Sequence, residues 1–168
     1  MSAARFLVAA GLVGILMFGA SVSSATERGK VTNLPIPRFV SMKASEGNVR
    51  RGPSLNHRID WVYKRRDIPL VITDEFGNWR RVEDRDGAGG WMHHTLLSGV
   101  RTVIIEHDMV AMRLRPDQEA PVNARAEAGV IAELDACIMD WCRVEAGKHK
   151  GWVMKTSLWG TTPEEIRE

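Results

Sequence analysis

Short stretches of alternating apolar and polar residues run through the chain from Phe39 onward, and turn residues separate them roughly every eight to twelve positions. In the stretch Ile59–Tyr63, for example, residues 59, 61 and 63 would lie on one face of a strand and residues 60 and 62 on the other. Residues 68–72 are more continuously apolar, which is typical of a buried strand. The pattern predicts an all-β protein of short strands with little helix.

The strand pattern occurs twice along the chain. Three blocks of a first unit have counterparts in a second: Val49-Arg50-Arg51 with Met112-Arg113-Leu114, Trp79-Arg80-Arg81-Val82 with Trp141-Cys142-Arg143-Val144, and Gly90-Trp91-Met92 with Gly151-Trp152-Val153. The offsets are 63 (49 to 112), 62 (79 to 141) and 61 (90 to 151). Such a nearly constant offset predicts a duplicated unit of about sixty residues.

The repeat and the flanking sequences predict five segments. They are a signal peptide over 1–25, a linker over 26–38, a first small barrel over 39–100, a second over 101–160, and a polar tail over 161–168. Each barrel would have about five short strands. A unit of this size buries little surface alone, so we expect the two to pack together with almost no linker. The tail is expected to fray.

The N-terminal segment has the features of a secretory signal. Arg5 precedes the apolar stretch 6–22, and Ser23-Ser24-Ala25 offers small residues for cleavage after Ala25. The alternative is an uncleaved anchor, although the apolar stretch is at the short end of the range for a membrane span. No other stretch is apolar enough to cross a bilayer. The sequence therefore predicts an exported protein of the periplasm or cell envelope.

Charges of both signs are interspersed over the rest of the chain. Without Arg5, the only charged residue among the first 25, the chain has 22 Lys and Arg against 21 Asp and Glu. Nucleic-acid binding requires a concentrated basic face, which this pattern does not provide. The same balance argues against a charge-steered membrane surface. The charge pattern is that of an ordinary soluble domain.

Four residues separate the two cysteines, Cys137 and Cys142, in the second repeat. In an exported protein an even number of cysteines favours a disulfide. Residues 138–141 can form a hairpin tip that places the two cysteines opposite each other on facing strands. The loop is small, so chain entropy predicts only about 2 kcal/mol of stabilisation. The alternative is a pair of reduced thiols.

With these motifs, the chain resembles the bacterial SH3-like (Src-homology-3-like) family, in the tandem form found in exported proteins. The resemblance covers roughly 36–160, and its motifs are Asn48-Val49-Arg50-Arg51-Gly52-Pro53-Ser54, Trp79-Arg80-Arg81-Val82, Gly90-Trp91-Met92 and Leu96-Leu97-Ser98-Gly99, with the corresponding blocks of the second repeat. The second repeat departs from the pattern at Leu114-Arg115-Pro116-Asp117. The resemblance implies β-barrel modules that bind a ligand, often near the cell envelope, without catalysis.

The aromatic residues provide the candidate site. Four tryptophans recur at matching repeat positions and are predicted to pack in the cores: Trp79, Trp91, Trp141 and Trp152. Trp61 and Tyr63 have no aromatic counterpart in the second repeat. They are therefore candidates for a ligand-binding surface, together with Arg50 and Arg65. The alternative is that Trp61 and Tyr63 are core residues.

Metal and catalytic sites are not predicted. His93 and His94 are adjacent, and neighbours on a strand point to opposite faces. A zinc site of Cys137, Cys142 and His149 would lack a fourth ligand. The sequence has no nucleophile elbow, His-Glu-x-x-His motif or glycine-rich phosphate loop. We expect no metal, no cofactor and no enzymatic activity.

The function expected from the sequence is an exported binding module. Its partner would be a peptide, a peptidoglycan component or an envelope protein. One alternative is an assembly protein whose barrels pack on a protein partner without a wall ligand. A thiol-redox or stress protein that cycles Cys137 and Cys142 is a third. The identity of the ligand and the oligomeric state do not follow from the sequence.

Overall fold

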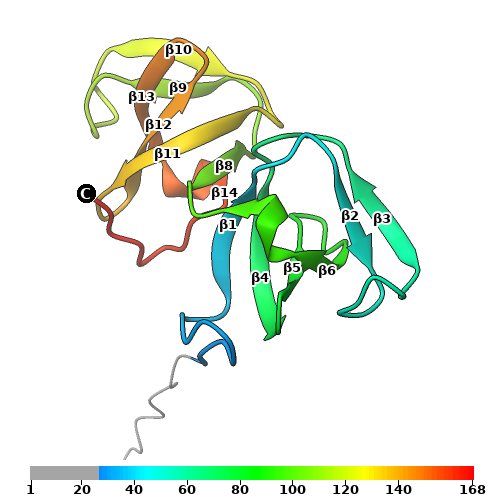
Figure 1. Ribbon diagram of the computed structural model, residues 1–168. Coiled ribbons are helices and arrows are strands. Elements are labelled where there is room, and N and C mark those ends of the chain that lie inside the picture. Colours follow the sequence, from blue (N-terminus) through cyan, green and yellow to red (C-terminus); the bar gives the residue numbers. More distant parts are fainter. Residues whose placement is uncertain (1–26) are drawn as a thin grey trace, which may run out of the picture.

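The computed structural model describes residues 27–168, so the predicted signal peptide and its cleavage after Ala25 lie outside the described residues. Strands and two single turns of 3₁₀ helix make up the regular structure of this part of the chain (Figure 1). Within residues 27–168, no helix has the length and apolar character needed to cross a lipid bilayer.

The strands form two antiparallel sheets of seven strands each. The first contains β1 (Arg38–Met42), β2 (Gly47–Arg50), β3 (Ile59–Tyr63), β4 (Pro69–Phe76), β5 (Trp79–Glu83), β6 (Gly89–His93) and β7 (Leu97–Ser98), with the 3₁₀ turn η1 (His94–Leu96) before β7. The second contains β8 (Thr102–Ile105), β9 (Val110–Arg113), β10 (Val122–Ala126), β11 (Ile131–Cys137), β12 (Trp141–Ala146), β13 (His149–Met154) and β14 (Leu158–Trp159), with η2 (Lys155–Ser157) before β14.

The two sheets have the same topology. Their strand orders are β3-β2-β6-β5-β4-β1-β7 and β10-β9-β13-β12-β11-β8-β14, which coincide when seven is added to each number of the first. The prediction of an all-β tandem fold is therefore confirmed. Each sheet has seven strands rather than about five because the β2–β3 and β9–β10 hairpins and the two-residue strands β7 and β14 also pair. The outermost strands do not pair with each other, so the sheets are not closed barrels.

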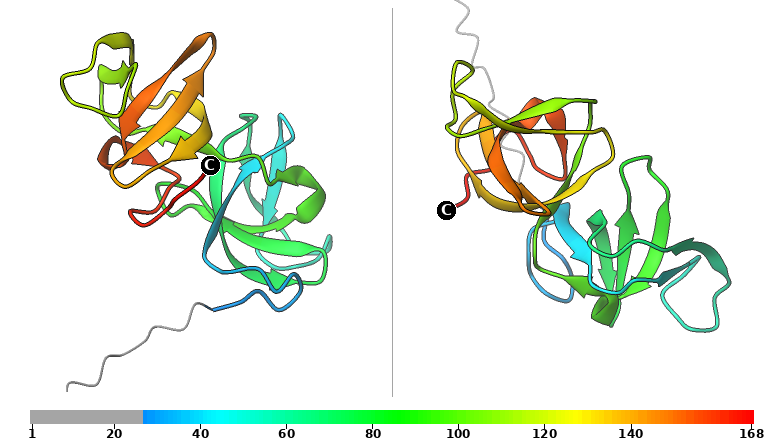
Figure 2. Two further views of the ribbon diagram at one scale, coloured as in Figure 1. Left: turned by 90° about the vertical axis from the view of Figure 1, so that its left-hand side faces the viewer. Right: turned by 90° about the horizontal axis from the view of Figure 1, so that it is seen from above.

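Figure 2 shows the two units side by side as separate groups of strands, and each unit has its own hydrophobic core. Equivalent positions of the repeat supply several core residues of both units, namely Val49 and Met112, Val82 and Val144, and Met92 and Val153. The apolar residues of each core alternate with outward-facing residues along the strands, as expected for strands with one buried face. The two copies therefore share core positions as well as strand order.

The units meet along β1 of the first and β8 and β14 of the second (Figure 1). The rings of Phe39 and Trp159 pack edge to face, with centroids 5.3 Å apart. The Arg101 guanidinium lies over the Phe39 ring, 5.4 Å from its centroid. The Thr102 hydroxyl donates to the carbonyl oxygen of Asp67 at 2.7 Å. Residues 99–101 separate β7 from β8, so the chain passes directly from one unit to the next.

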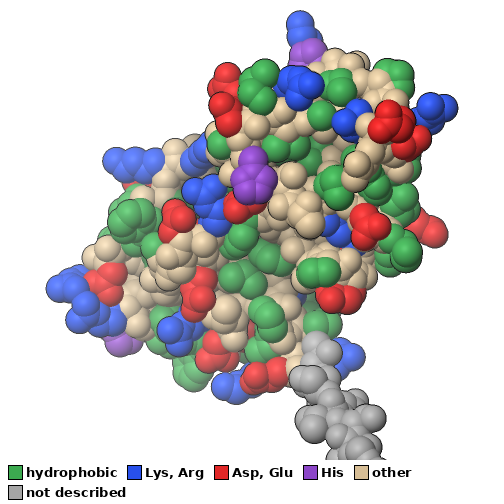
Figure 3. All heavy atoms as spheres, turned by 180° about the vertical axis from the view of Figure 1, so that it is seen from behind, with side chains coloured by type: hydrophobic (Ala, Val, Ile, Leu, Met, Phe, Trp, Pro, Cys, Tyr) green, Lys and Arg blue, Asp and Glu red, His purple; other side chains and the backbone are tan. Residues whose placement is uncertain are grey.

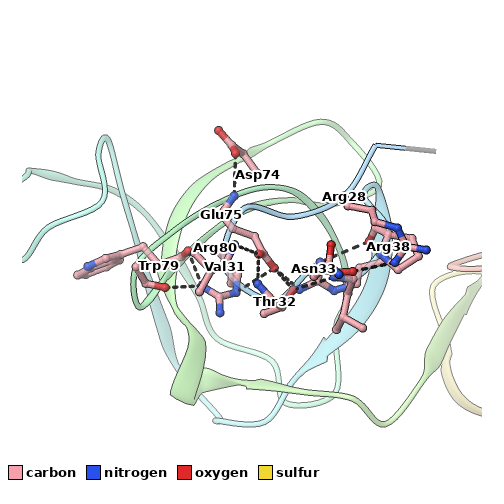
Figure 4. A network of polar contacts seen from close by, with 12 residues as sticks. Arg28, Val31, Thr32, Asn33, Arg38, Asp74, Glu75, Trp79 and Arg80 are labelled. Atoms are coloured by element: carbon pink, nitrogen blue, oxygen red, sulfur yellow. Dashed lines mark hydrogen bonds and ion pairs between the residues drawn. The ribbon is translucent and has the colours of Figure 1, made fainter. Parts of the chain in front are cut away.

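The described part of the segment predicted as a linker over 26–38 docks on the first unit ahead of β1. Its anchor is Glu75 at the end of β4, whose side chain is buried (Figure 4). The Glu75 carboxylate accepts hydrogen bonds from the Thr32 hydroxyl at 2.7 Å and from the backbone amides of Thr32 and Val31 at 2.8 and 3.0 Å. Arg38 donates to it at 2.6 Å, and Arg80 lies 3.5 Å away. A buried carboxylate needs such partners, which explains the ordered segment.

Cys137 and Cys142 of the second unit occupy the positions of Glu75 and Arg80. Glu75 pairs with Arg80 across β4 and β5, and Cys137 pairs with Cys142 across β11 and β12. The two cysteines form the predicted disulfide, with Cα atoms 4.1 Å apart, and both are buried. One unit thus joins these facing positions by an ion pair and the other by a covalent bond.

The C-terminal segment docks beside the disulfide, in contrast to the predicted frayed tail over 161–168. The backbones of Arg167 and Cys137 exchange hydrogen bonds of 2.8 and 2.9 Å. The buried Lys155 ammonium donates to the carbonyl oxygens of Pro163 and Glu165, at 2.8 and 2.7 Å. Arg101 also forms an ion pair with Glu165 at 2.9 Å. The tail is ordered because it supplies the carbonyl oxygens that Lys155 contacts and the carboxylate that pairs with Arg101.

The acid stability of the first unit should depend on Glu75. Burial raises the pKa of this carboxyl, but hydrogen bonds from Thr32, Arg38 and Val31 outweigh burial and lower the pKa from 4.5 to about 2. The stabilisation is therefore complete above pH 4.5 and is lost as the pH falls toward 2, by about 3 kcal/mol in total.

This dependence can be measured by urea unfolding of the unchanged protein and of Glu75→Gln between pH 6 and pH 2.5. The variant lacks the titrating group, so the difference in unfolding free energy between the two proteins should shrink over this interval. If the unfolding free energies of the two proteins differ by the same amount at every pH, Glu75 is not the titrating group.

Candidate ligand-binding grooves

The four repeated tryptophans are partly exposed and do not belong to either core, which corrects the prediction that they pack there. In β5 the buried residues are Arg80 and Val82, so Trp79 faces outward. In β6 the buried residue is Met92, so Trp91 faces outward. Trp141 and Trp152 follow the same alternation in β12 and β13. In each strand the neighbours of the tryptophan, and not the tryptophan itself, face the core.

A groove of about 600 Å³ lies beside Trp79 in the first unit. Groove 1 is lined by Pro53, Ser54, Leu55, Asn56, Asn78, Trp79 and His93. The Trp79 and His93 rings pack edge to face with centroids 5.4 Å apart. The loop 51–58 forms the opposite wall, where the Leu55 side chain is 74% exposed. Groove 1 thus combines apolar surface with amide and imidazole groups that can form hydrogen bonds.

An equivalent groove of about 430 Å³ lies beside Trp141 in the second unit. Groove 2 is lined by His107, Val110, Ala111, Arg113, Gln118, Glu119, Trp141, Met154 and Ser157. Trp141 and Met154 are the repeat counterparts of Trp79 and His93. The loop 114–121 takes the place of 51–58. The fold therefore forms the same groove twice, with charged residues added in groove 2.

Arg50 holds the wall of groove 1 instead of facing a ligand. Its guanidinium donates to the carbonyl oxygens of Leu55 and His57, at 3.0 and 2.7 Å. In the second unit Arg113 donates in the same way to the carbonyl oxygen of Ala120 at 2.7 Å. Each arginine thereby fixes the loop that it precedes.

Glycine at position 90 lets β6 lie close to β2. A Cβ atom on Gly90 would lie 2.7 Å from the Arg50 carbonyl oxygen, a distance that real Cβ contacts do not show. A Cβ atom on its counterpart Gly151 would lie 2.8 Å from the backbone carbon of Met112. The Gly-Trp motif therefore combines a close strand crossing with an outward-facing indole.

The surface predicted from Trp61, Tyr63, Arg50 and Arg65 is not assembled as one site. Trp61 is 50% exposed on β3, whereas Tyr63 is only 4% exposed. The Tyr63 hydroxyl lies 2.8 Å from the Ala88 carbonyl oxygen and 3.1 Å from the Asp84 carboxylate. Burial and this carboxylate raise the pKa of the hydroxyl. Arg65 lines a separate cavity between the units. Tyr63 is thus a core residue, and Trp61 lines neither groove.

The remaining candidates do not form a metal centre in the described part of the chain. Within residues 27–168, no group of three or more His, Cys, Asp or Glu side chains is placed to hold an ion. Cys137 and Cys142 are bonded to each other, so neither sulfur is a free thiolate ligand. His93 instead lies 2.8 Å from the Thr95 hydroxyl through Nδ1.

Comparisons with known proteins define the family of these units. The family model described as "Bacterial SH3 domain" matches residues 43–99 and 106–160. No curated protein matches the chain. Two solved structures, of NlpC2 and NlpC1 from Trichomonas vaginalis, are each 11% identical to it, with TM-scores of 0.35 and 0.34. The alignments cover 74% and 90% of this chain, but only 48% and 52% of those chains, so this chain spans about half their length. The two family matches cover β2–β7 and β9–β14 and take up well over half of the sequence, and the chain belongs to the bacterial SH3 domain family.

Proposed function

We propose that this protein is an exported, non-catalytic module that binds peptidoglycan through grooves 1 and 2. The observation that carries the proposal is that both units form a groove around a partly exposed tryptophan at equivalent positions, Trp79 and Trp141. Bacterial SH3 domains bind cell-wall components, which supports this class of ligand. The predicted signal peptide over 1–25 supports export to the compartment where peptidoglycan occurs.

The chemistry of the grooves suits a ligand that has both sugar and peptide parts. An indole face can stack on a sugar ring or on an apolar side chain, and its N–H can donate a hydrogen bond. Asn56 and Asn78 add amide donors and acceptors to groove 1. Arg113 and Glu119 add one charge of each sign to groove 2. Two grooves on one chain also raise the overall affinity for a polymer that repeats its units.

The proposal is tested by sedimenting the mature chain, residues 26–168, with isolated peptidoglycan. Trp79→Ala and Trp141→Ala should each weaken binding about 30-fold, the effect of removing an aromatic residue that contributes about 2 kcal/mol. The double variant should not bind measurably. Trp61→Ala is the matched control, because it removes an equally large exposed ring outside both grooves.

Two results would overturn this function. The unchanged protein could sediment no more than an unrelated β-protein, which would exclude a wall ligand. Alternatively, Trp61→Ala could abolish binding while the groove variants bind normally, which would place the binding site at Trp61 on β3. Cell fractionation that finds the protein in the cytoplasm would contradict the proposed export.

Exposed apolar side chains favour a second candidate function, that of an assembly protein. The tips of the β4–β5 and β11–β12 hairpins expose Phe76 by 63% and Met139 by 76%. Figure 3 shows further apolar side chains among the charged ones on one face of the molecule, and apolar surface that is contiguous is typical of contacts with another protein. Crosslinking in cells that captures one stoichiometric protein, without wall association, would favour this candidate over peptidoglycan binding.

A further inference from the structure

A cavity of about 400 Å³ lies between the two units, apart from grooves 1 and 2. Its lining residues are Arg65, Arg66, Asp67, Val100, Thr102, Ile131, Glu133, Glu145 and Gly147. The first unit contributes Arg65 and Arg66, from the turn after β3, and the second contributes Glu133 on β11 and Glu145 on β12. The first wall also carries the Asp67 carboxylate, but its two arginines leave it with a net positive charge, whereas the second wall is anionic.

Each wall places like charges together. Glu133 and Glu145 are direct partners across β11 and β12, an arrangement that is unfavourable for two carboxylates. Lys150 lies 3.9 Å from Glu145, but its shorter contact is with Asp135 at 2.7 Å. Arg65 and Arg66 are consecutive in sequence. Within residues 27–168, neither these arginines nor Glu133 have an ion-pair partner within 4.0 Å, so the charges do not neutralise each other across the cavity.

Three of these four charges, those of Arg65, Arg66 and Glu133, are absent from the equivalent positions of the repeat, whereas Glu145 corresponds to Glu83. Tyr63 and Ala126 are the last residues of β3 and β10, so Lys64-Arg65-Arg66 correspond to Glu127-Ala128-Gly129. Glu133 corresponds to Val71, which pairs with Glu83 in the first unit. The basic turn therefore exists only in the first unit and the acidic pair only in the second. The two copies differ in charge where they face each other.

Fixed contacts hold the two walls in position. The bond from the Thr102 hydroxyl to the Asp67 carbonyl oxygen joins the units at the cavity itself. The Phe39–Trp159 contact and the ion pair of Arg85 with Glu106, at 3.6 Å, join them elsewhere. A small ligand carrying both charges could therefore neutralise both walls without any movement of the units.

We propose that this cavity binds a short peptide with free ends. Arg65 and Arg66 hold its carboxylate, and Glu133 and Glu145 hold its ammonium group. Val100 and Ile131 supply apolar surface for the part between the ends. A guanidinium is well suited to this task because its planar set of donors matches a carboxylate. The proposal does not depend on peptidoglycan binding by grooves 1 and 2.

The test is a titration of the mature chain with tri-alanine, followed by NMR through the backbone amides of Thr102 and Gly147. Two analogues serve as probes of each end: N-acetyl-tri-alanine, which lacks the ammonium group, and tri-alanine amide, which lacks the carboxylate. Each analogue should bind at least about tenfold more weakly than tri-alanine, as expected for the loss of one charge-assisted contact.

Paired substitutions identify which wall holds which end. In Arg65→Gln/Arg66→Gln, tri-alanine and its amide should bind equally, because the carboxylate no longer has a partner. In Glu133→Gln/Glu145→Gln, tri-alanine and its N-acetyl analogue should bind equally for the corresponding reason. Arg81→Gln/Glu83→Gln is the matched control, since it removes an exposed pair of the same charges outside the cavity.

Three results would each overturn the proposal. Tri-alanine could fail to saturate the shifts at Thr102 and Gly147, the blocked analogues could bind as well as tri-alanine, or the wall variants could bind like the unchanged protein. The Trp79→Ala/Trp141→Ala variant should bind tri-alanine normally. A failure of this proposal is thereby distinguished from a failure of the groove function.

Discussion

Replacing Glu75 by glutamine is expected to lower the unfolding free energy of the first unit by about 3 to 5 kcal/mol, the usual cost of removing one partner from a buried ion pair. Arg38 and Arg80 would lose the carboxylate that both of them contact. The amides of Val31 and Thr32 would lose a charged acceptor. The docked segment before β1 should therefore detach as well.

Asp74→Asn provides the matched control, because Asp74 is the adjacent carboxylate and forms an exposed ion pair with Lys30 at 3.4 Å. An exposed pair of this kind contributes at most about 1 kcal/mol. Urea unfolding measures the free energies, and hydrogen exchange at Val31 and Thr32 reports detachment of the segment. Equal stability of the two variants would contradict the importance given to the Glu75 network.

Cys142→Ser is expected to destabilise the second unit by about 3 kcal/mol and to leave the first unit folded. About 2 kcal/mol comes from loss of the small loop closed by the disulfide, and the rest from a hydroxyl buried in an apolar core. Hydrogen exchange should accelerate in β11–β13 and remain unchanged in β4–β6. The two units have separate cores, so the effect should stay within one of them.

Asp140→Ser controls for the chemical change, because it introduces the same side chain at the exposed tip of the same hairpin. It should unfold like the unchanged protein. If Cys142→Ser instead accelerates exchange in both units equally, the units unfold as one cooperative body. A bridge that resists mild reductant in the unchanged protein would also argue against the thiol-redox alternative.

The duplication, the all-β class and the Cys137–Cys142 bridge could be predicted from the sequence because each depends on local spacing. The direction of the tryptophans was harder to predict. Arg80 is buried next to Trp79, so the usual rule that the apolar neighbour faces the core fails at this position. The buried arginine is explained by Glu75, which belongs to another strand. Val82 is the apolar residue of β5 that faces the core, and alternation along the strand from Val82 would have been enough to place Trp79 on the outward face.

The docked end segments could not be predicted because their partners are distant in sequence. Glu75 lies beside Asp74 in what reads as an ordinary polar strand end, and its burial depends on Thr32, more than forty positions earlier. Tyr63 is likewise buried, unlike Trp61, because oxygen atoms of Asp84 and Ala88 lie within hydrogen-bonding distance of its hydroxyl. Local periodicity places two residues on one face, but it does not specify how far along that face the core extends.

The opposite positions of the two docked segments affect the order in which the units can be completed during synthesis. The strands, the core and the Glu75 network of the first unit lie between residues 31 and 98, so an emerging chain can complete them early. The second unit lacks the backbone pairing of Cys137 until Arg167 has emerged. The disulfide joins two facing positions of the β11–β12 hairpin, so its geometry does not depend on these last residues.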